Sequence, residues 1–342
     1  MNGRLGAVAV AACLGLLAGC ASAPPAPVYT PPPTLPPMDP VAVAAAVDPA
    51  LVNIASDGGL FDATASGSGI VLTPDGEVLT SHHVIKGADR IDVVDVGTGA
   101  TYVATVLGYD RDRDIALLDL PDVDGLSVAR LAADPPRVGT EVLAIGNAGG
   151  TGGVPTAVGG RIIDLDRTIV ARNAGDLTRN ALSGLIEVRA PVTAGQSGGA
   201  LVDSTGAVLG VLAAASGRVS ESDQPRGFAV PIDDALEVVE QIRSGVSTDA
   251  VHIGPTATLG VLISNASNGV RVGAALYGQP AAQADIPDAA VILALDGRPV
   301  GSVSDVRAVI DRMSPGETIS VGWLDAAGAR HDTAVAVGEG TP

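Results

Sequence analysis

Short apolar runs separated by turn-forming residues mark the chain between about residues 50 and 232. The first pair spans residues 70–72 and 77–80, and Pro74-Asp75-Gly76 between them is typical of a tight turn. This pattern predicts a β-hairpin. Two further apolar runs, at residues 115–118 and 208–212, predict buried strands.

Two later segments repeat apolar residues with the period of a helix. In the first, which ends at Gly245, the apolar face consists of Ile232, Leu236, Val239 and Ile242. In the second, near residues 303–313, the apolar stripe consists of Val306, Val309, Ile310 and Met313. We expect both helices to pack these faces on a core.

Length and composition predict a globular chain of more than one unit. With 342 residues, 46% of them apolar, it has room for two domains or for a double barrel with an appendage. Only 2% of the residues are aromatic, so the cores must consist of Val, Leu, Ile and Ala. The net charge of −18 argues against nucleic acid as a partner, because phosphate contacts need Lys or Arg.

Cysteine and histidine usage predicts neither a disulfide nor a metal site in the folded part. Both cysteines, Cys13 and Cys20, lie in the first twenty residues. The four histidines show no HExxH spacing. We therefore expect no metal and no other cofactor.

The N-terminus predicts secretion and a lipid anchor. Arg4 precedes an apolar stretch at residues 5–17 that is too short for a comfortable membrane span, which is typical of a signal peptide, here residues 1–19. Leu17-Ala18-Gly19-Cys20 resembles the bacterial lipobox, so Cys20 is the predicted lipidation site and the membrane of the cell envelope the predicted location. The alternative is an ordinary signal peptide cut after Gly19 or Ala23.

Residues 20–45 are predicted to be a proline-rich tether. Nine of the seventeen residues from Pro24 to Pro40 are proline, which favours extended polyproline II. At ~3.1 Å per residue the segment could hold the folded part roughly 50 Å from the lipid.

Three side chains combine into a candidate for nucleophilic catalysis. Ser197 lies in the glycine-rich stretch GQSGGAL, His83 follows a predicted strand in SHHV, and Asp114 directly precedes the apolar run at residues 115–118. A serine hydroxyl needs a base, and a buried carboxylate can orient that base. The amides of Gly195 and Ser197 could bind an oxyanion.

Each of these assignments has an alternative. His82 could be the functional histidine and His83 a core residue, and Ser197 could be a turn serine. Asp110 and Asp112 compete with Asp114, but only Asp114 adjoins the apolar strand, and the other two are typical of a solvated turn.

Four motifs in this order resemble the trypsin-like serine proteases of the HtrA type. They are Ser66-Gly67-Ser68-Gly69-Ile70, TSHHV, DRDIALL and GQSGGAL. The resemblance implies an all-β fold, a pair of six-stranded antiparallel barrels at about residues 50–130 and 138–232, with the triad in the crease between them. It favours His83 over His82, makes the helix after residue 231 a closing helix, and implies a protease domain at residues 46–244.

The matching position at the base of the substrate pocket is Pro191. Cleavage after Arg or Lys would need a carboxylate there, so this residue disfavours it. Together with Leu212 in the apolar run, Pro191 suggests a small to medium aliphatic side chain in the substrate.

After a polar linker around residues 244–255, residues 255–338 resemble a PDZ domain, a small α+β unit that binds peptide C-termini. Leu259, Gly260 and Val261 correspond to its carboxylate loop. The chain departs from the pattern at Asp285 and at Ala289-Ala290, where the family has glycine and Gly-Asp, and we expect a rebuilt turn there. The alternative is a structural cap on the protease.

The resemblance implies a serine endopeptidase of the envelope that cleaves unfolded or damaged polypeptides. The alternative is a non-catalytic scaffold or holdase that binds exposed chains with the same fold. Many members of the family form homotrimers, and the sequence leaves the oligomeric state of this chain open.

Overall fold

The computed structural model describes residues 35–58, 63–172, 179–215 and 225–342. The predicted lipidation site Cys20 and the signal peptide lie outside these ranges. Within them, no helix combines the length and the apolar character needed to cross a membrane.

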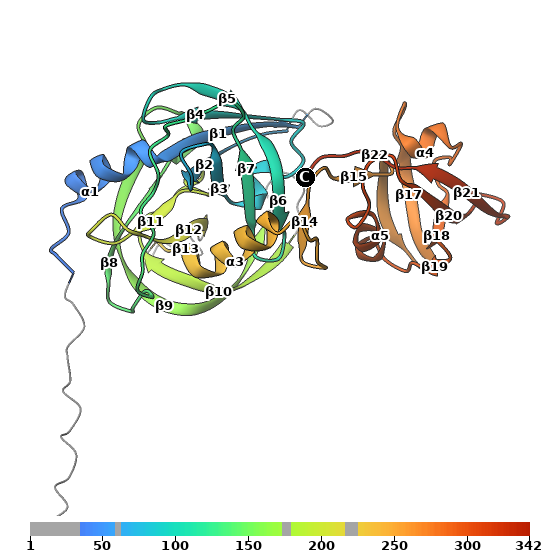
Figure 1. Cartoon of the computed structure of the whole chain (residues 1–342). Coiled ribbons are helices and arrows are strands. Elements are labelled where there is room, and N and C mark those ends of the chain that lie inside the picture. The colour runs from blue at the N-terminus through green and yellow to red at the C-terminus, as the bar shows by residue number, and fades with distance from the viewer. Residues whose placement is uncertain (1–34, 59–62, 173–178, 216–224) are drawn as a thin grey trace, which may run out of the picture. The chain divides into compact units, whose positions relative to one another are not determined.

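The first half of the body that precedes the C-terminal module is an open antiparallel sheet (Figure 1). Its eight strands follow the order β14-β6-β7-β3-β2-β1-β4-β5. Seven come from one continuous stretch: β1 (Leu51–Gly58), β2 (Ala63–Val71), β3 (Glu77–Thr80), β4 (Arg90–Asp95), β5 (Thr101–Val103), β6 (Thr105–Asp110) and β7 (Ile115–Asp119). The short helix α2 (His82–Ile85) directly follows β3.

The second half is a closed six-stranded barrel of order β10-β13-β12-β11-β8-β9. Its strands are β8 (Glu141–Gly146), β9 (Thr156–Arg172), β10 (Arg179–Arg189), β11 (Ala200–Val202), β12 (Val208–Ala215) and β13 (Gly227–Pro231). The 3₁₀ turn η2 (Ala148–Gly150) lies between β8 and β9. The all-β, trypsin-like architecture is confirmed, although the hydrogen bonds close only this second sheet.

The hairpin predicted from the apolar pattern forms as β2 and β3. Ile70 pairs with Leu79 and Val71 with Val78, and all four side chains are buried. Gly76 in the turn has φ +118°, and a Cβ there would collide with the carbonyl of Leu120. The turn therefore requires glycine both for its backbone conformation and for its close approach to the chain after β7.

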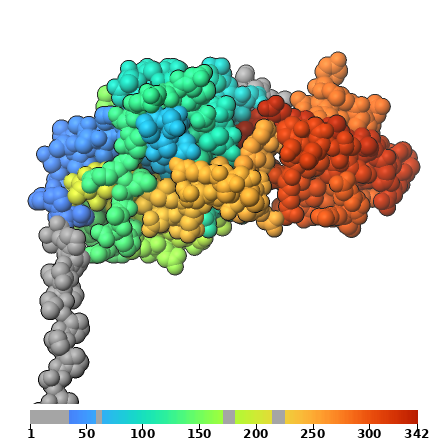
Figure 2. Space-filling model, in the orientation of Figure 1, coloured from blue at the N-terminus to red at the C-terminus, as the bar shows by residue number. Residues whose placement is uncertain are grey.

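The closing helix α3 (Ile232–Arg243) packs its apolar face on the core and remains on the molecular surface (Figure 2). Ile232, Val239 and Ile242 are buried as expected, and Leu236 is half-buried. The last turn ends with the Gly245 amide donating to Ile242, and Gly245 has φ +70°. The sequence thus located both the face and the end of this helix.

The structure moves two predicted boundaries. Helix α1 (Pro40–Val47) occupies residues assigned to the tether, and Val43 and Val47 are buried in the main core, so the folded body begins before residue 46. Strand β14 (Val251–Ile253) lies in the segment expected to be a polar linker and pairs with β6. Burial of apolar side chains decides both cases, because proline at the first turn is compatible with a helix.

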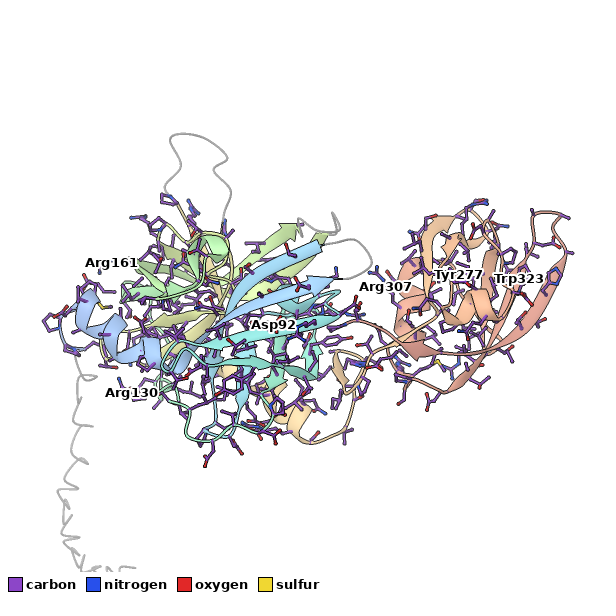
Figure 3. All side chains as sticks on the ribbon, turned by 90° about the horizontal axis from the view of Figure 1, so that it is seen from above. Asp92, Arg130, Arg161, Tyr277, Arg307 and Trp323 are labelled. Atoms are coloured by element: carbon purple, nitrogen blue, oxygen red, sulfur yellow. The ribbon has the colours of Figure 1, made fainter. Side chains whose placement is uncertain are left out.

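The C-terminal module, residues 255–342, has its own core around Val272, Ile292 and Val321. Its main sheet has the order β16-β17-β18-β20-β21, with β19 (Arg298–Pro299) paired to β18 (Val291–Leu295). The other strands are β16 (Val261–Ala266), β17 (Gly269–Ala275), β20 (Thr318–Leu324) and β21 (Arg330–Ala336), and β15 (Ala257–Thr258) pairs with β22 (Gly338–Glu339). Trp323 of β20 is labelled in Figure 3, and its indole donates to Thr333.

Helices α4 (Pro280–Gln283) and α5 (Val303–Ile310) complete this module. Val306 and Ile310 of α5 are buried, and a capping box of Ser302 and Asp305 starts the helix. Tyr277, also labelled in Figure 3, precedes α4 and is fully exposed.

The turn near residues 285–290, which we expected to be rebuilt, contains two residues in the left-handed conformation that glycine favours: Asp285 has φ +57° and Ala289 has φ +65°. The Ala289 amide donates to the carbonyl of Val272 at 2.8 Å, which holds the turn against β17. Asp tolerates this conformation, whereas alanine is strained in it.

Candidate active site

The imidazole of His83 is held by Asp114. Its Nδ1 lies 2.7 Å from Asp114 Oδ2, and its backbone amide donates to Oδ1 of the same carboxylate at 2.9 Å. Asp114 is buried and has φ +57°, a left-handed conformation that points the carboxylate back at α2. Because both oxygens are engaged, the ring has a defined orientation, with Nδ1 as the donor and Nε2 as the basic nitrogen.

Opposing effects act on the pKa of His83. Burial lowers it, whereas the Asp114 carboxylate raises it by its charge and by its hydrogen bond, and the net pKa lies above the ordinary value. Asp114 therefore stabilises the imidazolium, which is the form that a general base adopts after it takes a proton.

His82, the competing histidine, occupies a different environment. The residue is 3% exposed, its ring lies 4.7 Å from the ring of Tyr109, and its Nε2 has no hydrogen-bond partner among the described residues. Burial lowers its pKa to about 3, so the ring stays neutral at physiological pH. His82 therefore packs as a core side chain, and its backbone amide donates to the carbonyl of Asp114.

Asp110, the buried alternative to Asp114, shapes the turn instead. Its Oδ1 accepts from the amides of Asp112 and Arg113, each at 2.9 Å. Burial raises its pKa, and these amides lower it in part. Asp112 lines a small cavity beside Leu182 and Asp234, on another part of the surface.

Ser197 lies in a loop that is hydrogen-bonded to the segment carrying His83. The carbonyl of Leu212 accepts both from the amide of Gly198 at 2.6 Å and from the hydroxyl of Ser81 at 3.1 Å. A Cβ at Gly67 would meet Val84 on one side and the carbonyl of Ser197 on the other. The neighbours of Ser197 and of His83 thus meet at the junction of the two sheets. The Ser197 hydroxyl itself is 3.5 Å from the carbonyl of Ala213.

The amides of Gly195 and Ser197 are available for an anion. Among the described residues, neither N–H donates to any recorded acceptor. Gly195 has φ +89°, and a Cβ there would collide with the carbonyl of Asn147. Glycine is therefore required at this position for the loop to present its N–H groups.

The two predicted pocket residues lie in different environments. Pro191 is exposed, whereas the side chain of Leu212 is fully buried in the core of the second barrel. Leu212 therefore contributes its carbonyl to the nucleophile loop, and its side chain does not form a pocket wall. Gly227 packs against Val192, which fills the space next to Pro191.

Sequence reasoning missed a row of three aromatic rings, those of His82, Tyr109 and His252, next to the helix α2 that carries His83. Tyr109 is buried between His82 and His252, and the ring of His252 lies 4.9 Å from its own. Arg111 lies over Tyr109 and donates to its hydroxyl. No motif signals this arrangement, because β14, which carries His252, comes 142 positions after Tyr109 and joins it only through strand pairing.

Comparison with known proteins identifies the family. The family described as "Trypsin-like peptidase domain" matches residues 67–211, a range that contains His83, Asp114 and Ser197. The serine protease PepD of Mycobacterium tuberculosis is 31% identical over 291 residues, covering 80% of this chain and 61% of PepD. The chain is therefore similar to HtrA-type serine proteases.

Two further HtrA-type or related proteins extend the likeness. The periplasmic pH-dependent serine endoprotease DegQ of Escherichia coli is 30% identical, covering 75% of this chain and 56% of DegQ. A solved structure of the HtrA-type protease AlgW with a tripeptide has 28% identity and a TM-score of 0.50, covering 88% of this chain and 97% of AlgW. The chain spans less than two thirds of the length of the curated relatives PepD and DegQ.

Proposed function

We propose that this protein is a serine endopeptidase that works through an acyl-enzyme, with His83, Asp114 and Ser197 as its catalytic residues. The observation that carries the proposal is the 2.7 Å contact between His83 Nδ1 and the Asp114 carboxylate, next to a serine loop in which two amides have no acceptor within the described ranges. A base, an orienting group and an oxyanion site are what acyl transfer requires.

In this mechanism the Ser197 hydroxyl attacks the peptide carbonyl while His83 Nε2 takes its proton. Asp114 stabilises the resulting imidazolium, and the amides of Gly195 and Ser197 bind the oxyanion of the tetrahedral intermediate. His83 then gives the proton to the leaving amine, and the C–N bond breaks. Water hydrolyses the acyl-enzyme with His83 again acting as the base, and none of these steps needs a cofactor.

A fluorophosphonate probe tests this proposal. We expect the probe to label the wild-type chain and Ser320→Ala, whose serine is exposed on β20 far along the sequence, but not Ser197→Ala. The assay includes a peptide that activates related loop-gated enzymes, because a resting loop would lower labelling. Labelling of Ser197→Ala at the wild-type level, or no labelling of the wild-type chain with that peptide, would refute the assignment.

We infer a preference for a small to medium aliphatic residue before the cleaved bond. Support comes from Pro191, which places no carboxylate where a basic side chain would need one, and from the apolar Val192 behind it. A peptide-library cleavage profile tests the inference. Enrichment of Val, Ala or Leu at that position would agree with it, and enrichment of Arg or Lys would contradict it.

We propose that the substrates are unfolded or damaged polypeptides of the cell envelope. The names of the relatives support this, since DegQ is described as periplasmic and AlgW was solved with a tripeptide. Digestion of a protein in its native form and of the same protein reduced and carboxymethylated provides the test. Equal cleavage of the two forms would contradict the proposal.

We propose that the C-terminal module is a PDZ-type unit that binds peptide C-termini by strand addition. Strand β16 forms one edge of its sheet, and Asn265 of β16 accepts from the amide of Val303 at the start of α5, so the edge strand and the helix are adjacent, as strand addition requires. In the predicted carboxylate loop Leu259 is buried, Gly260 donates to Thr258 Oγ1 and Val261 begins β16. Calorimetry with an apolar peptide should show binding for the free carboxylate and much weaker binding for the amidated peptide.

We also propose that Cys20 carries the lipid anchor, on the lipobox-like sequence before it. Cys20→Ser should move the protein from the membrane fraction to the soluble fraction of the envelope, and retention in the membrane fraction would contradict the anchor.

Assembly into homotrimers, as in many relatives, is tested by analytical ultracentrifugation of the chain without its anchor.

A further inference from the structure

Ser68 connects the two sheets at the nucleophile loop through its backbone. It lies on β2 and is 1% exposed. Its amide donates to the carbonyl of Ser197 at 2.8 Å, and its carbonyl accepts from the hydroxyl of Thr80 at 2.7 Å. The position of Ser68 is therefore determined relative to both Ser197 and the strand that leads to His83.

The hydroxyl of Ser68 makes two more hydrogen bonds, and their directions follow from the partners. The backbone amide of Asn147 lies 2.8 Å from Ser68 Oγ, and the carbonyl oxygen of Gly195 lies 2.9 Å from it. An amide can only donate and a carbonyl can only accept, so the hydroxyl proton must point to Gly195. Both partners and the hydroxyl are buried, which makes an unpaired group there costly.

These bonds fix the peptide groups on both sides of Gly195. The carbonyl of Ala194 accepts from the amide of Gly149 at 2.8 Å, so the N–H of the same peptide, that of Gly195, points the opposite way. The carbonyl of Gly195 is held by Ser68. The Gly149 contact thus leaves the Gly195 N–H open, and the Ser68 contact fixes the carbonyl that follows it, at a glycine whose backbone could otherwise adopt many conformations.

The following residue is anchored separately. Gln196 is fully buried, and its side chain donates to the carbonyl of Thr156 at 3.0 Å and accepts from the amide of Thr193 at 3.0 Å. The loop as a whole therefore stays in place without Ser68. The Ser68 hydroxyl holds the carbonyl end of the Gly195–Gln196 peptide group, whose amide end donates to the carbonyl of Thr193 at 3.2 Å.

We propose that Ser68 is a positioning residue for the oxyanion site: its hydroxyl holds the carbonyl of Gly195 and thereby fixes the backbone between the two oxyanion amides, those of Gly195 and Ser197. This inference rests on the serine endopeptidase activity proposed above. Ser68 touches neither His83 nor Asp114 in any recorded contact of the described chain, so its effect is on the oxyanion and not on the base.

Steady-state kinetics of Ser68→Ala in the full chain test the proposal. Removing the hydroxyl leaves the Gly195 carbonyl without its partner, and we expect kcat to fall about tenfold or more, since loss of one oxyanion donor costs roughly 100- to 1,000-fold. KM should change little, because the contact acts on the transition state. The apparent pKa of the pH profile should stay at the wild-type value, because the His83–Asp114 pair is intact.

Ser56→Ala is the matched control. Ser56 is also buried, and its hydroxyl donates to the carbonyl of Val84 in α2 at 2.7 Å, so its loss removes a buried hydrogen bond of similar length outside the nucleophile loop. If the two variants lose similar thermal stability but only Ser68→Ala loses kcat, the role of Ser68 is positional. Wild-type kcat in Ser68→Ala, or equal losses in both variants, would overturn the inference.

A second variant at Ser68 and the fluorophosphonate experiment distinguish failure of the positioning role from failure of the proposed function. Ser68→Cys keeps a weak donor of similar shape and should have a kcat between those of Ser68→Ala and the wild type. If the wild-type chain itself does not react at Ser197, the proposed function fails. If it reacts and Ser68→Ala turns over equally fast, only the positioning role fails.

Discussion

At the scale of single residues, the site depends on Asp114 more than on any other side chain. Its left-handed backbone, φ +57°, turns the carboxylate toward α2, where one oxygen binds the His83 amide and the other the His83 ring. Asp114 therefore fixes the backbone of His83 and the orientation of its imidazole together. An Asp accepts this conformation more readily than most residues, which suits it for both tasks.

We predict that Asp114→Asn lowers kcat about 10⁴-fold while the protein remains folded. The amide group can offer N–H to Nδ1, which would favour the tautomer whose Nε2 carries the proton and cannot act as the base. Hydrolysis of a peptide substrate and far-UV circular dichroism provide the two readouts. A variant with more than a tenth of the wild-type kcat would contradict this role.

The pKa of His83 predicts the acid side of the pH profile. Only neutral His83 can take the proton, and its pKa lies above the ordinary 6.5 because of Asp114. We therefore expect kcat/KM to fall as the pH decreases through an apparent pKa above that value, measured on the free enzyme. In Asp114→Asn the residual activity should persist to lower pH, because the carboxylate charge that raises the pKa of His83 is gone.

At the scale of elements, the turn before β18 shows that a left-handed backbone conformation does not require glycine. Asp285 and Ala289 both adopt positive φ, and the amide of Ala289 is bonded to β17. The neighbouring Ile286 and Ala290 are buried in the core of the module. Packing and strand pairing thus outweigh a local strain of about 1–2 kcal/mol at one alanine.

We predict that Ala289→Gly stabilises the C-terminal module by about 0.5–1 kcal/mol. Relief of the left-handed strain exceeds the entropy that glycine loses on folding, and Ala289 is exposed, so no packing is lost. Asp285→Gly is the matched comparison and should gain less, because Asp tolerates positive φ. Denaturant unfolding measures both, and destabilisation by Ala289→Gly would contradict the argument.

At the scale of the whole molecule, the protease part is completed by segments distant in sequence. Two of these segments, β14 and α3, approach Gly108 of β6. A Cβ at Gly108 would lie 2.6 Å from the carbonyl of His252 on β14 and 2.9 Å from Ile242 of α3. Strand β14 and helix α3 therefore approach the first sheet so closely that only glycine fits at position 108.

We predict that Gly108→Ala destabilises the protein by about 1–3 kcal/mol, because β14 and α3 must shift to admit one methyl group. Gly159→Ala is the control, since Gly159 also lies in a strand, β9, but a Cβ there meets no atom within 4 Å. Its effect should stay within about 0.5 kcal/mol. Equal stability of the two variants in urea unfolding would show that β14 does not pack as described.

The features that the sequence determined by itself are local. The β2–β3 hairpin, the face and end of α3, and the order of the His, Asp and Ser motifs follow from periodicity, turn residues and neighbouring glycines within a few positions. Such signals depend on contacts between residues close in the chain, so they can be recognised in one sequence.

Tertiary structure decided what depends on distant contacts. It bonded His83 and not His82 to the Asp114 carboxylate, buried α1 in the core, added β14 to β6 and placed the Ser68 hydroxyl under Gly195. Both histidines are chemically equivalent in the sequence, and their environments differ only after the strands pair. Burial and hydrogen-bond partners are properties of the folded chain, and they determine which of two identical side chains can take up a proton near neutral pH.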